Sequence, residues 1–227
     1  MANRPVYLPY LKGQALVTPV AVEFTWVAGM AVSQKQKSIR SLHEAAAKRN
    51  IVRALEISSK SENPLGVQLS AFNLPFVMPN GLKTTVENAF QAGKVFRHGG
   101  PYTDLLNKSP REAKKDPRLS SSGDLIGFRL EAEEWPTRPV TAFYDWIYLS
   151  ALKQSPGLAE QLLDFDGFTD IEFNPERSLN CQAASAALFV ALSKRGELEN
   201  ATASRDDFIA RLSLGTPSSR PLQSSLL

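Results

Sequence analysis

Three polar side chains of different chemistry fall in one short segment, TTVENAFQAGK, which runs from Thr84 to Lys94. If this segment is an α-helix of about 3.6 residues per turn, Glu87, Gln91 and Lys94 lie on one side of it, at positions i, i+4 and i+7. Glu87 and Lys94 are then roughly 10 Å apart along the helix axis, which is too far for a helical ion pair and leaves room for a ligand. A carboxylate and an amine across such a gap suit the chemistry of a sugar bonded to nitrogen.

Breaking a bond between a ribose carbon and nitrogen makes two demands. The sugar carbon becomes cation-like, so a carboxylate can stabilise it and a carboxylic acid can protonate the leaving nitrogen. A lysine that burial keeps partly neutral can also trap the opened sugar as a Schiff base. Ordinary interpretations remain open, because Thr84 and Glu87 have the spacing of a helix capping box and Lys94, like most lysines, is expected at the surface.

Length and composition bound the fold and its setting. The chain has 227 residues, 43% of them hydrophobic, which is enough to bury the core of one sizeable domain without disulfides. Cys181 is alone, and His43 and His98 are too few for a Cys/His metal cage. We therefore expect no metal, no cofactor and a reducing, cytoplasmic setting. No secretion signal and no run of about 18 apolar residues is evident, so no membrane contact is expected either.

The net charge is only +3, but the basic residues are unevenly spread. Six of them lie between Ser33 and Arg53, where Glu44 is the only acidic residue: Lys35, Lys37, Arg40, Lys48, Arg49 and Arg53. Such a run suits contacts with the phosphates of a nucleic acid. A solvated helix face is the alternative interpretation.

Apolar periodicity and turn residues predict a mixture of strands and helices. A strand is expected over 21–27, a helix that begins at an N-cap Ser33, and an extended segment over 51–59. Pro79-Asn80-Gly81 predicts a tight turn between two short extended pieces. The helix that starts at Thr84 is expected to end at the Gly99-Gly100-Pro101 breaker.

The second half of the chain is predicted to be mainly helical. Ser109, Pro110 and Glu112 form the signature of a short capped helix. Buried helices are expected over 142–152 and 180–196, with a further helix over 157–163. Ser and Pro dominate residues 216–227, which predicts a disordered tail.

Several of these segments resemble the landmarks of the NADAR family, also called YbiA-like. They are, in chain order, LSAFNLPFVMPNGLKTTVENAFQAGKVF, SPREAKK and FTDIEFNPERSLNCQAASAALFVAL. The resemblance implies a single helix-rich α+β domain around a small β-sheet. Residues 56–196 would form its core, with 1–55 as an N-terminal strand-helix elaboration, 197–215 as a C-terminal helical flank and 216–227 as the tail.

The chain as a whole, including SQKQKSIRSLHEAA, looks still closer to the NADAR proteins that accompany DarT toxins acting on guanine. This resemblance implies an antitoxin hydrolase that removes ADP-ribose from guanine bases in DNA. Its substrate would be ADP-ribosylated DNA, its product ADP-ribose, and a DarT-type toxin would be encoded alongside. Two alternatives are an N-glycosidase of riboflavin-pathway intermediates and a non-catalytic module that binds ADP-ribose or NAD. The presence of both Glu87 and Lys94 argues against the module.

Site residues follow from the resemblance, motif by motif. Glu87 matches the catalytic glutamate and is expected to move protons, and Lys94 is expected to form the Schiff base. Asp170, in FTD, matches an acidic residue that would orient the sugar hydroxyls, although a turn aspartate is the alternative. The residues expected to contact the substrate are Lys60, Ser70, Phe72, Asn73, Gln91, Arg111, Lys114, Phe173 and Asn180.

Different members of this set are expected to contact different parts of the substrate. Lys60, Arg111 and Lys114 are candidates for the pyrophosphate, with exposed surface charge as the alternative. Phe72 would stack on a base or else belong to the core. Tyr144, Trp146 and Phe173 are candidates for a wall beside the base, although the apolar surroundings of Trp146 favour the core for it.

The chain also departs from the family pattern at three places. Asn88 stands where a histidine usually follows the glutamate, so this protein must move protons without it. EFNPERSL replaces the usual Trp-Gly approach to the last helix, and the Leu-Gly expected after Asn180 is absent. Substrate contacts in this region are therefore not carried over.

Overall fold

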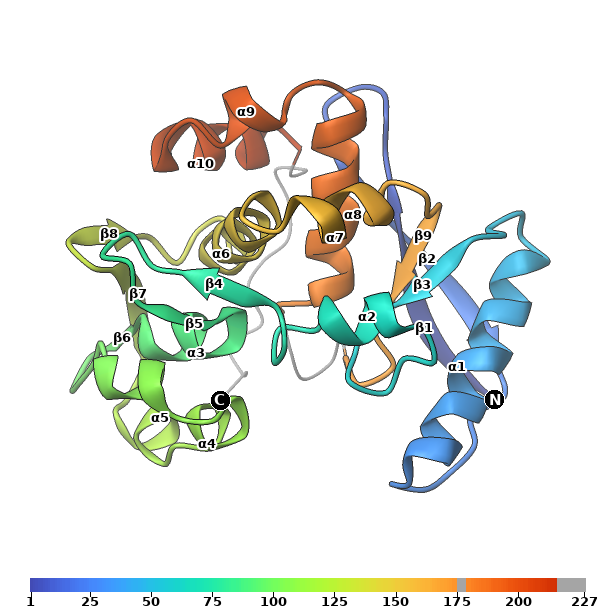
Figure 1. Cartoon of the computed structure of the whole chain (residues 1–227), viewed down its shortest axis with the longest axis horizontal. Helices are drawn as coiled ribbons and strands as arrows, with labels where there is room; N and C mark the ends of the chain where they lie inside the picture. The colour runs from blue at the N-terminus through green and yellow to red at the C-terminus, as the bar shows by residue number, and fades with distance from the viewer. Residues whose placement is uncertain (175–178, 216–227) are drawn as a thin grey trace.

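The fold combines helices with small sheets, as the sequence predicts. A computed structural model of the chain describes residues 1–174 and 179–215. Within these ranges the strands form a four-stranded, a three-stranded and a two-stranded sheet, and helices pack around and between them (Figure 1). The expected α+β class is confirmed. The predicted disordered tail, residues 216–227, lies outside the described residues.

The helical elements alternate irregularly with the strands along the chain. The helices are α1 (Val32–Ala47), α2 (Pro64–Gln68), α3 (Val86–Ala92), α4 (Pro110–Lys114), α5 (Arg118–Ser121), α6 (Ala142–Lys153), α7 (Pro156–Leu162), α8 (Gln182–Lys194), α9 (Leu198–Ala201) and α10 (Arg205–Leu214), with a 3-10 helix η1 (Thr103–Asn107). The strands are β1 (Ala2–Pro9), β2 (Val17–Phe24), β3 (Ala54–Glu56), β4 (Pro75–Val77), β5 (Lys83–Thr85), β6 (Lys94–Phe96), β7 (Leu125–Leu130), β8 (Glu133–Trp135) and β9 (Gly167–Thr169).

The largest sheet joins the N-terminal strands to β9, which comes more than 140 residues later in the chain. Its order is β2-β1-β9-β3, with β1 antiparallel to β2 and β9 parallel to β3. The prediction placed one N-terminal strand too late and missed β1, which contains Pro5 and Pro9. Pro5 is tolerated because β1 meets β9 only at Tyr7, so the proline is not required to donate a ladder hydrogen bond to that neighbour.

Two apolar cores hold the sheet between helices. On one face, Ile39 and Leu42 of α1 pack with Val6, Val22 and Ile171. On the other, α8 packs against β1 and β9, and its small and large apolar residues share a larger core with α6. The predicted buried helices over 142–152 and 180–196 are confirmed as α6 and α8.

The segment around the candidate chemistry begins as predicted and ends differently. β4 and β5 pair across the expected Pro79-Asn80-Gly81 turn, where Gly81 has a φ of +86°. α3 follows at once but stops at Ala92, well before the predicted breaker. The chain then enters β6, which pairs with β7.

The molecule has two flanks with the helices α6, α7 and α8 between them (Figure 1). Figure 1 shows α1 and the four-stranded sheet on one side, α3 to α5 with β6 to β8 on the other, and α6 to α8 in the middle. In the described ranges, no helix is both long and apolar enough to cross a membrane.

Candidate active site

The carboxylate of Glu87 is buried in the first turn of α3 and is held by two partners. Only 4% of the residue is exposed. Gln91 donates from Nε2 to Glu87 Oε1 at 2.8 Å, and Lys114 Nζ lies 3.8 Å from the same oxygen. The carboxylate thus lies between an amide and an ammonium group, in a place where water has little access.

The start of α3 leaves the Glu87 side chain free for this role. The predicted capping box between Thr84 and Glu87 is wrong, because Thr84 belongs to β5 and donates its hydroxyl proton to Leu106 O at 2.9 Å. Thr85 is the N-cap, and its side chain accepts from Asn88 N at 3.3 Å. Pairing between β4 and β5 continues through Thr85, so the helix begins one residue later than expected.

Asn88, which replaces the usual histidine, has a structural role. Its Nδ2 donates to the carbonyl oxygens of Leu105 at 2.8 Å and Lys108 at 2.6 Å, while its Oδ1 accepts from the Thr85 hydroxyl at 2.9 Å. The two amide donations join α3 to η1 and the residue after it, and the bond from Thr85 secures the N-cap of α3. The Asn88 side chain is therefore committed to structural hydrogen bonds and offers no group for proton transfer at Glu87.

Lys94 lies in β6, so the predicted row of three residues on one helix face is wrong. The helix ends before Gly93, because the Gly93 carbonyl accepts from Arg129 N at 2.7 Å and the chain begins to pair with β7. The Lys94 side chain nevertheless returns toward α3. Its Nζ lies 4.7 Å from the centroid of the Phe90 ring, in a cation–π contact.

Burial makes Lys94 an unusually acidic lysine. Its pKa is lowered to about 8, chiefly by loss of water on burial; the Glu87 carboxylate opposes this shift and the positive charge of Lys114 adds to it. An ordinary lysine has a pKa of about 10.4 and is almost entirely protonated near neutrality. A useful fraction of Lys94 is instead the neutral amine, which is the form that attacks a sugar carbon.

Gln91 has one polar atom without a partner in the described structure. Its Nε2 is committed to Glu87, which fixes the orientation of the amide. Its Oε1 is buried and accepts no hydrogen bond from any described residue. Water has little access to it, because the residue is only 6% exposed. Because a buried acceptor without a donor is costly, this oxygen is a ready acceptor for a ligand hydroxyl group.

Asp170 follows β9 and is the second carboxyl group of the site. Its Oδ1 accepts from Glu172 N at 3.0 Å, and its Oδ2 accepts from Gln182 Nε2 at 3.0 Å. The pKa of Asp170 is raised by burial and by the charge of Glu56. These hydrogen bonds and the charge of Lys114 oppose the shift without reversing it. Lys114 therefore interacts electrostatically with Lys94 as well as with Asp170, which brings the predicted catalytic residues into one neighbourhood.

Glu56 holds the backbone on either side of Asp170, and the sequence analysis missed it. Its Oε2 accepts from the Thr169 hydroxyl at 2.6 Å and its Oε1 from Ile171 N at 2.8 Å. Thr169 Oγ1 is also 2.9 Å from His43 Nε2. Because the threonine proton goes to Glu56, His43 is the donor in that contact. Glu56 could have been noticed in the sequence, because it is the one carboxylate in the otherwise largely apolar run IVRALEIS.

Gln182 joins Asp170 to the segment that precedes Glu87, and it was also missed. Besides its bond to Asp170, its Nε2 donates to Ile57 O at 2.6 Å. Its Oε1 accepts from Ala71 N at 2.7 Å, and Ala71 O in turn accepts from Glu87 N at 2.9 Å. The signal was a polar residue at the position where the family motif N-x-L-G has leucine.

The S-N-F-like segment contributes an aromatic ring more clearly than polar groups. Phe72 is half-buried, with Lys114 Nζ 5.2 Å from its ring centroid. Ser70 and Asn73 both donate from their side chains to Val67 O, at 2.9 and 2.8 Å. In this structure the two side chains thus stabilise the turn after α2, and their contact with a substrate stays a prediction.

The remaining predicted residues lie at several depths. Phe173 is buried and packs edge-on against Tyr7, with the ring centroids 6.4 Å apart. Tyr144 is buried near the charge of Glu87. Trp146 packs against Trp135 and Phe208, which confirms the core position favoured for it. Lys60 and Asn180 are half-buried and Arg111 is exposed. The contacts with substrate expected for these three residues stay predictions.

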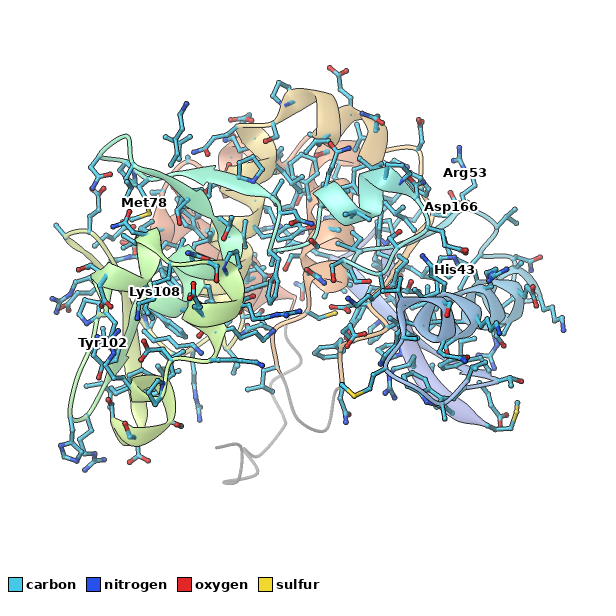
Figure 2. All side chains as sticks on the ribbon, turned by 60° about the horizontal axis from the view of Figure 1, so that its bottom comes forward. His43, Arg53, Met78, Tyr102, Lys108 and Asp166 are labelled. Carbon is cyan, nitrogen blue, oxygen red and sulfur yellow. The ribbon has the colours of Figure 1, made fainter. Side chains whose placement is uncertain are left out.

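The basic run of α1 is partly neutralised. Lys35 lies 3.4 Å from Glu172, Arg40 lies 3.5 Å from Glu62, and Arg53 lies 3.3 Å from Asp166. The Arg53 and Asp166 side chains meet on the surface beyond α1 (Figure 2). Half of the six cations therefore already have carboxylate partners.

Two hollows of the surface lie outside this cluster. One, of about 270 Å³, runs between α1 and the start of α2 and is lined by residues that include His43, Glu44 and Glu56. The other, of about 200 Å³, is lined mainly by apolar residues, with Asp145 and Cys181 among them. Within residues 1–174 and 179–215, no group of three or more His, Cys, Asp and Glu side chains could hold a metal ion.

Comparison with protein-family models assigns the chain to a family. The model of a protein family described as DarT1-associated NADAR antitoxin matches residues 2–219 of the chain, and the match therefore includes the N-terminal hairpin and α1 as well as the site. No curated protein matches the chain.

Proposed function

The chain belongs to the family of DarT1-associated NADAR antitoxins, and from this premise we propose that it hydrolyses the N-glycosidic bond between ADP-ribose and guanine in DNA. By removing the modification, it would act as the antitoxin of a DarT-type toxin encoded alongside. The observation that carries the proposal is the desolvated Lys94 amine, with its pKa lowered to about 8, beside the buried carboxylate of Glu87.

The first step makes the nucleophile. The Lys94 ammonium gives a proton to the Glu87 carboxylate, so the pair becomes a neutral amine and a carboxylic acid. The amine attacks the ribose carbon that is bonded to guanine, and the carbon–nitrogen bond to guanine breaks. The electron pair of that bond goes to the guanine nitrogen, which takes the proton from Glu87. Unmodified guanine then leaves.

The second step opens and releases the sugar. The bond between the same carbon and the ring oxygen breaks, a proton passes to that oxygen, and a protonated Schiff base forms with Lys94. Water then adds to the imine carbon while Glu87 accepts a proton. Departure of the lysine amine gives free ADP-ribose and restores the enzyme, so one water molecule is consumed in each cycle.

Two neighbouring groups are suited to hold the ribose during these steps. The buried Gln91 Oε1, which lacks a donor among the described residues, would accept one sugar hydroxyl. The Asp170 carboxyl, fixed by Gln182 and by the Glu172 amide, would bind another. Phe72, with Lys114 over its ring, would flank the base and the pyrophosphate.

A hydrolysis assay with defined substrates tests the proposal. A short oligonucleotide with one ADP-ribosyl-guanine is incubated with the wild-type protein, with Glu87→Gln and with Lys83→Gln, which alters an exposed lysine of β5. We expect wild type and Lys83→Gln to release ADP-ribose and intact DNA, and Glu87→Gln to lose most of this activity. Cleavage of an N-ribosyl pyrimidine phosphate by a wild-type protein that leaves the modified DNA intact would contradict the proposal.

A further inference from the structure

Helix α4 lies at the edge of the candidate active site. Its last residue, Lys114, places Nζ 3.8 Å from Glu87 Oε1 and 5.2 Å from the centroid of the Phe72 ring. A base that enters the site is still attached to its own strand, so the phosphates next to it must pass close to the rim. Cations that hold those phosphates are therefore expected on elements such as α4.

Two cations of α4 are available for this contact. Arg111 and the C-cap residue Lys115 are exposed, and neither forms an ion pair with a described residue. They are four residues apart and so lie on the same side of a helix. At about 100° per residue, Arg111, Lys114 and Lys115 share an arc of roughly 100°, with Lys114 directed at the site.

The carboxylates nearest to this face are already occupied. Glu112 accepts from Ser109 N at 3.0 Å in a capping box. Arg118 donates to Asp104 at 2.7 Å and to Asp116 at 2.8 Å. Arg118 therefore offsets the charges of Asp104 and Asp116, and the Glu112 side chain is turned back to Ser109, so none of the three forms an ion pair with Arg111 or Lys115.

The six cations between Ser33 and Arg53, on α1 and just after it, are less well placed. Three of the six have carboxylate partners. In both views α1 lies on the opposite side of the molecule from α4, and Figure 2 separates His43, on α1, from Lys108, which precedes α4. The phosphate-binding role that the charge pattern suggested for the α1 run is thus better filled elsewhere.

We propose that the DNA strand carrying the modified guanine lies along α4, with Arg111 and Lys115 bound to its backbone phosphates beside the site. The proposal rests on the proposed function, because it names how that substrate is held. It also moves Arg111 from the pyrophosphate of ADP-ribose, where the sequence placed it, to the phosphodiester backbone. Lys114 remains the cation nearest to the ADP-ribose itself.

The test compares two substrates and two double variants. Arg111→Gln/Lys115→Gln and the matched α1 variant Lys37→Gln/Lys48→Gln are assayed on a modified single-stranded oligonucleotide and on ADP-ribosyl-guanosine, which lacks a phosphodiester backbone. KM is measured between about 50 and 200 mM salt, the range over which phosphate contacts weaken strongly. Binding of an unmodified fluorescent single-stranded oligonucleotide is titrated over the same range.

The α4 variant should raise KM for the oligonucleotide only, with kcat unchanged. Each phosphate contact that is lost should reduce the slope of log affinity against log salt by about 0.7, so the double variant should reduce it by roughly 1.4. The α1 variant should behave as wild type. Equal losses on both substrates would place Arg111 at the pyrophosphate, and an unchanged slope, or a larger change in the α1 variant, would also overturn the proposal.

Failure of the proposed function has a different signature. In that case the wild type leaves both modified substrates intact, whereas the salt slope of oligonucleotide binding still reports on α4. A variant that loses activity on the oligonucleotide alone therefore reports on the α4 surface. A wild type that is inactive on the nucleoside contradicts the proposed hydrolysis.

Discussion

Lys94 is the residue on which the proposed chemistry depends most, because a Schiff base requires a neutral amine. Burial of this half-buried side chain and the charge of Lys114 favour that form. They act against the Glu87 carboxylate and the cation–π contact with the Phe90 ring, 4.7 Å from Nζ, both of which favour the ammonium. Glu87 has the complementary role. It is buried at 4% exposure, which keeps water away from the proton that it exchanges.

The pH dependence of covalent trapping should therefore follow Lys94. In the first step one proton moves from Lys94 to Glu87 and then to guanine, and this proton is lost as the pH rises through the Lys94 pKa of about 8. We expect the initial rate of borohydride trapping with modified DNA to be level below that pH and to fall about tenfold per unit above it. A rate that stays level to about pH 10, as for an ordinary lysine, would show that Lys94 is not the desolvated nucleophile.

Local sequence predicted a helix cap better than it predicted the element that carries Lys94. The Ser109 capping box is correct because its signal is confined to Ser109, Pro110 and Glu112. Lys94 was assigned to a helix because nothing nearby reveals that Gly93 and Lys94 pair with β7. That pairing involves residues more than thirty positions away, so helical spacing alone gave the wrong element.

At the scale of elements, a hydrogen-bond network connects β9, α8 and the segment before α3. Gln182 is its centre, with bonds to Asp170, Ile57 and Ala71. The bond to Ala71 spans 111 positions of the sequence. Glu56 fixes the residues on both sides of Asp170. Contacts of this kind are invisible in one sequence, which is why both residues were missed although their types were unusual for their positions.

Substitution of Gln182 should damage the site more than the fold. Gln182→Leu restores the leucine of the family motif but removes the donor to Asp170 and leaves the Ala71 N–H without its acceptor. Leaving a buried polar group without its partner costs about 1–3 kcal/mol, so we expect kcat on modified DNA to fall about 10- to 100-fold. Urea unfolding should show a loss of about 1–3 kcal/mol in the free energy of unfolding, a minor part of the roughly 5–15 kcal/mol typical of a folded protein, so the variant should remain folded.

Gln182→Glu separates the two roles of this side chain. It keeps an acceptor for Ala71 but places a second carboxyl group against Asp170. We therefore expect partial recovery of stability without recovery of kcat. Wild-type kcat in both variants would contradict a positioning role for Gln182.

For the whole molecule, the N-terminal 55 residues contribute directly to the surroundings of the site. Tyr7 packs on Phe173, Lys35 pairs with Glu172, and His43 donates to Thr169. These contacts all meet the short segment that carries Asp170. The sequence predicted a strand and a helix here but gave no sign that β1 and β2 would continue the sheet of β9 and β3.

This shared sheet predicts one cooperative unfolding transition. Leu42, on α1, and Leu149, on α6, are each 0% exposed but belong to different apolar clusters. We expect Leu42→Ala and Leu149→Ala each to lower the free energy of unfolding by about 2–5 kcal/mol and to shift one common transition, followed by near-UV and far-UV circular dichroism. A separate early transition in Leu42→Ala, with the core unchanged, would show that residues 1–55 fold independently.

The most direct test of the central claim is the mass of the protein after reaction with ADP-ribosyl-guanine DNA in the presence of borohydride. Reduction would convert the Schiff base into a stable amine, so we predict one added ADP-ribosyl unit, located on Lys94 by peptide mapping and absent from Lys94→Met. Lys94→Met keeps an unbranched apolar chain against Phe90, so its fold should be retained. Release of ADP-ribose by the wild type without any adduct, or an adduct on Lys114 in place of Lys94, would contradict the account.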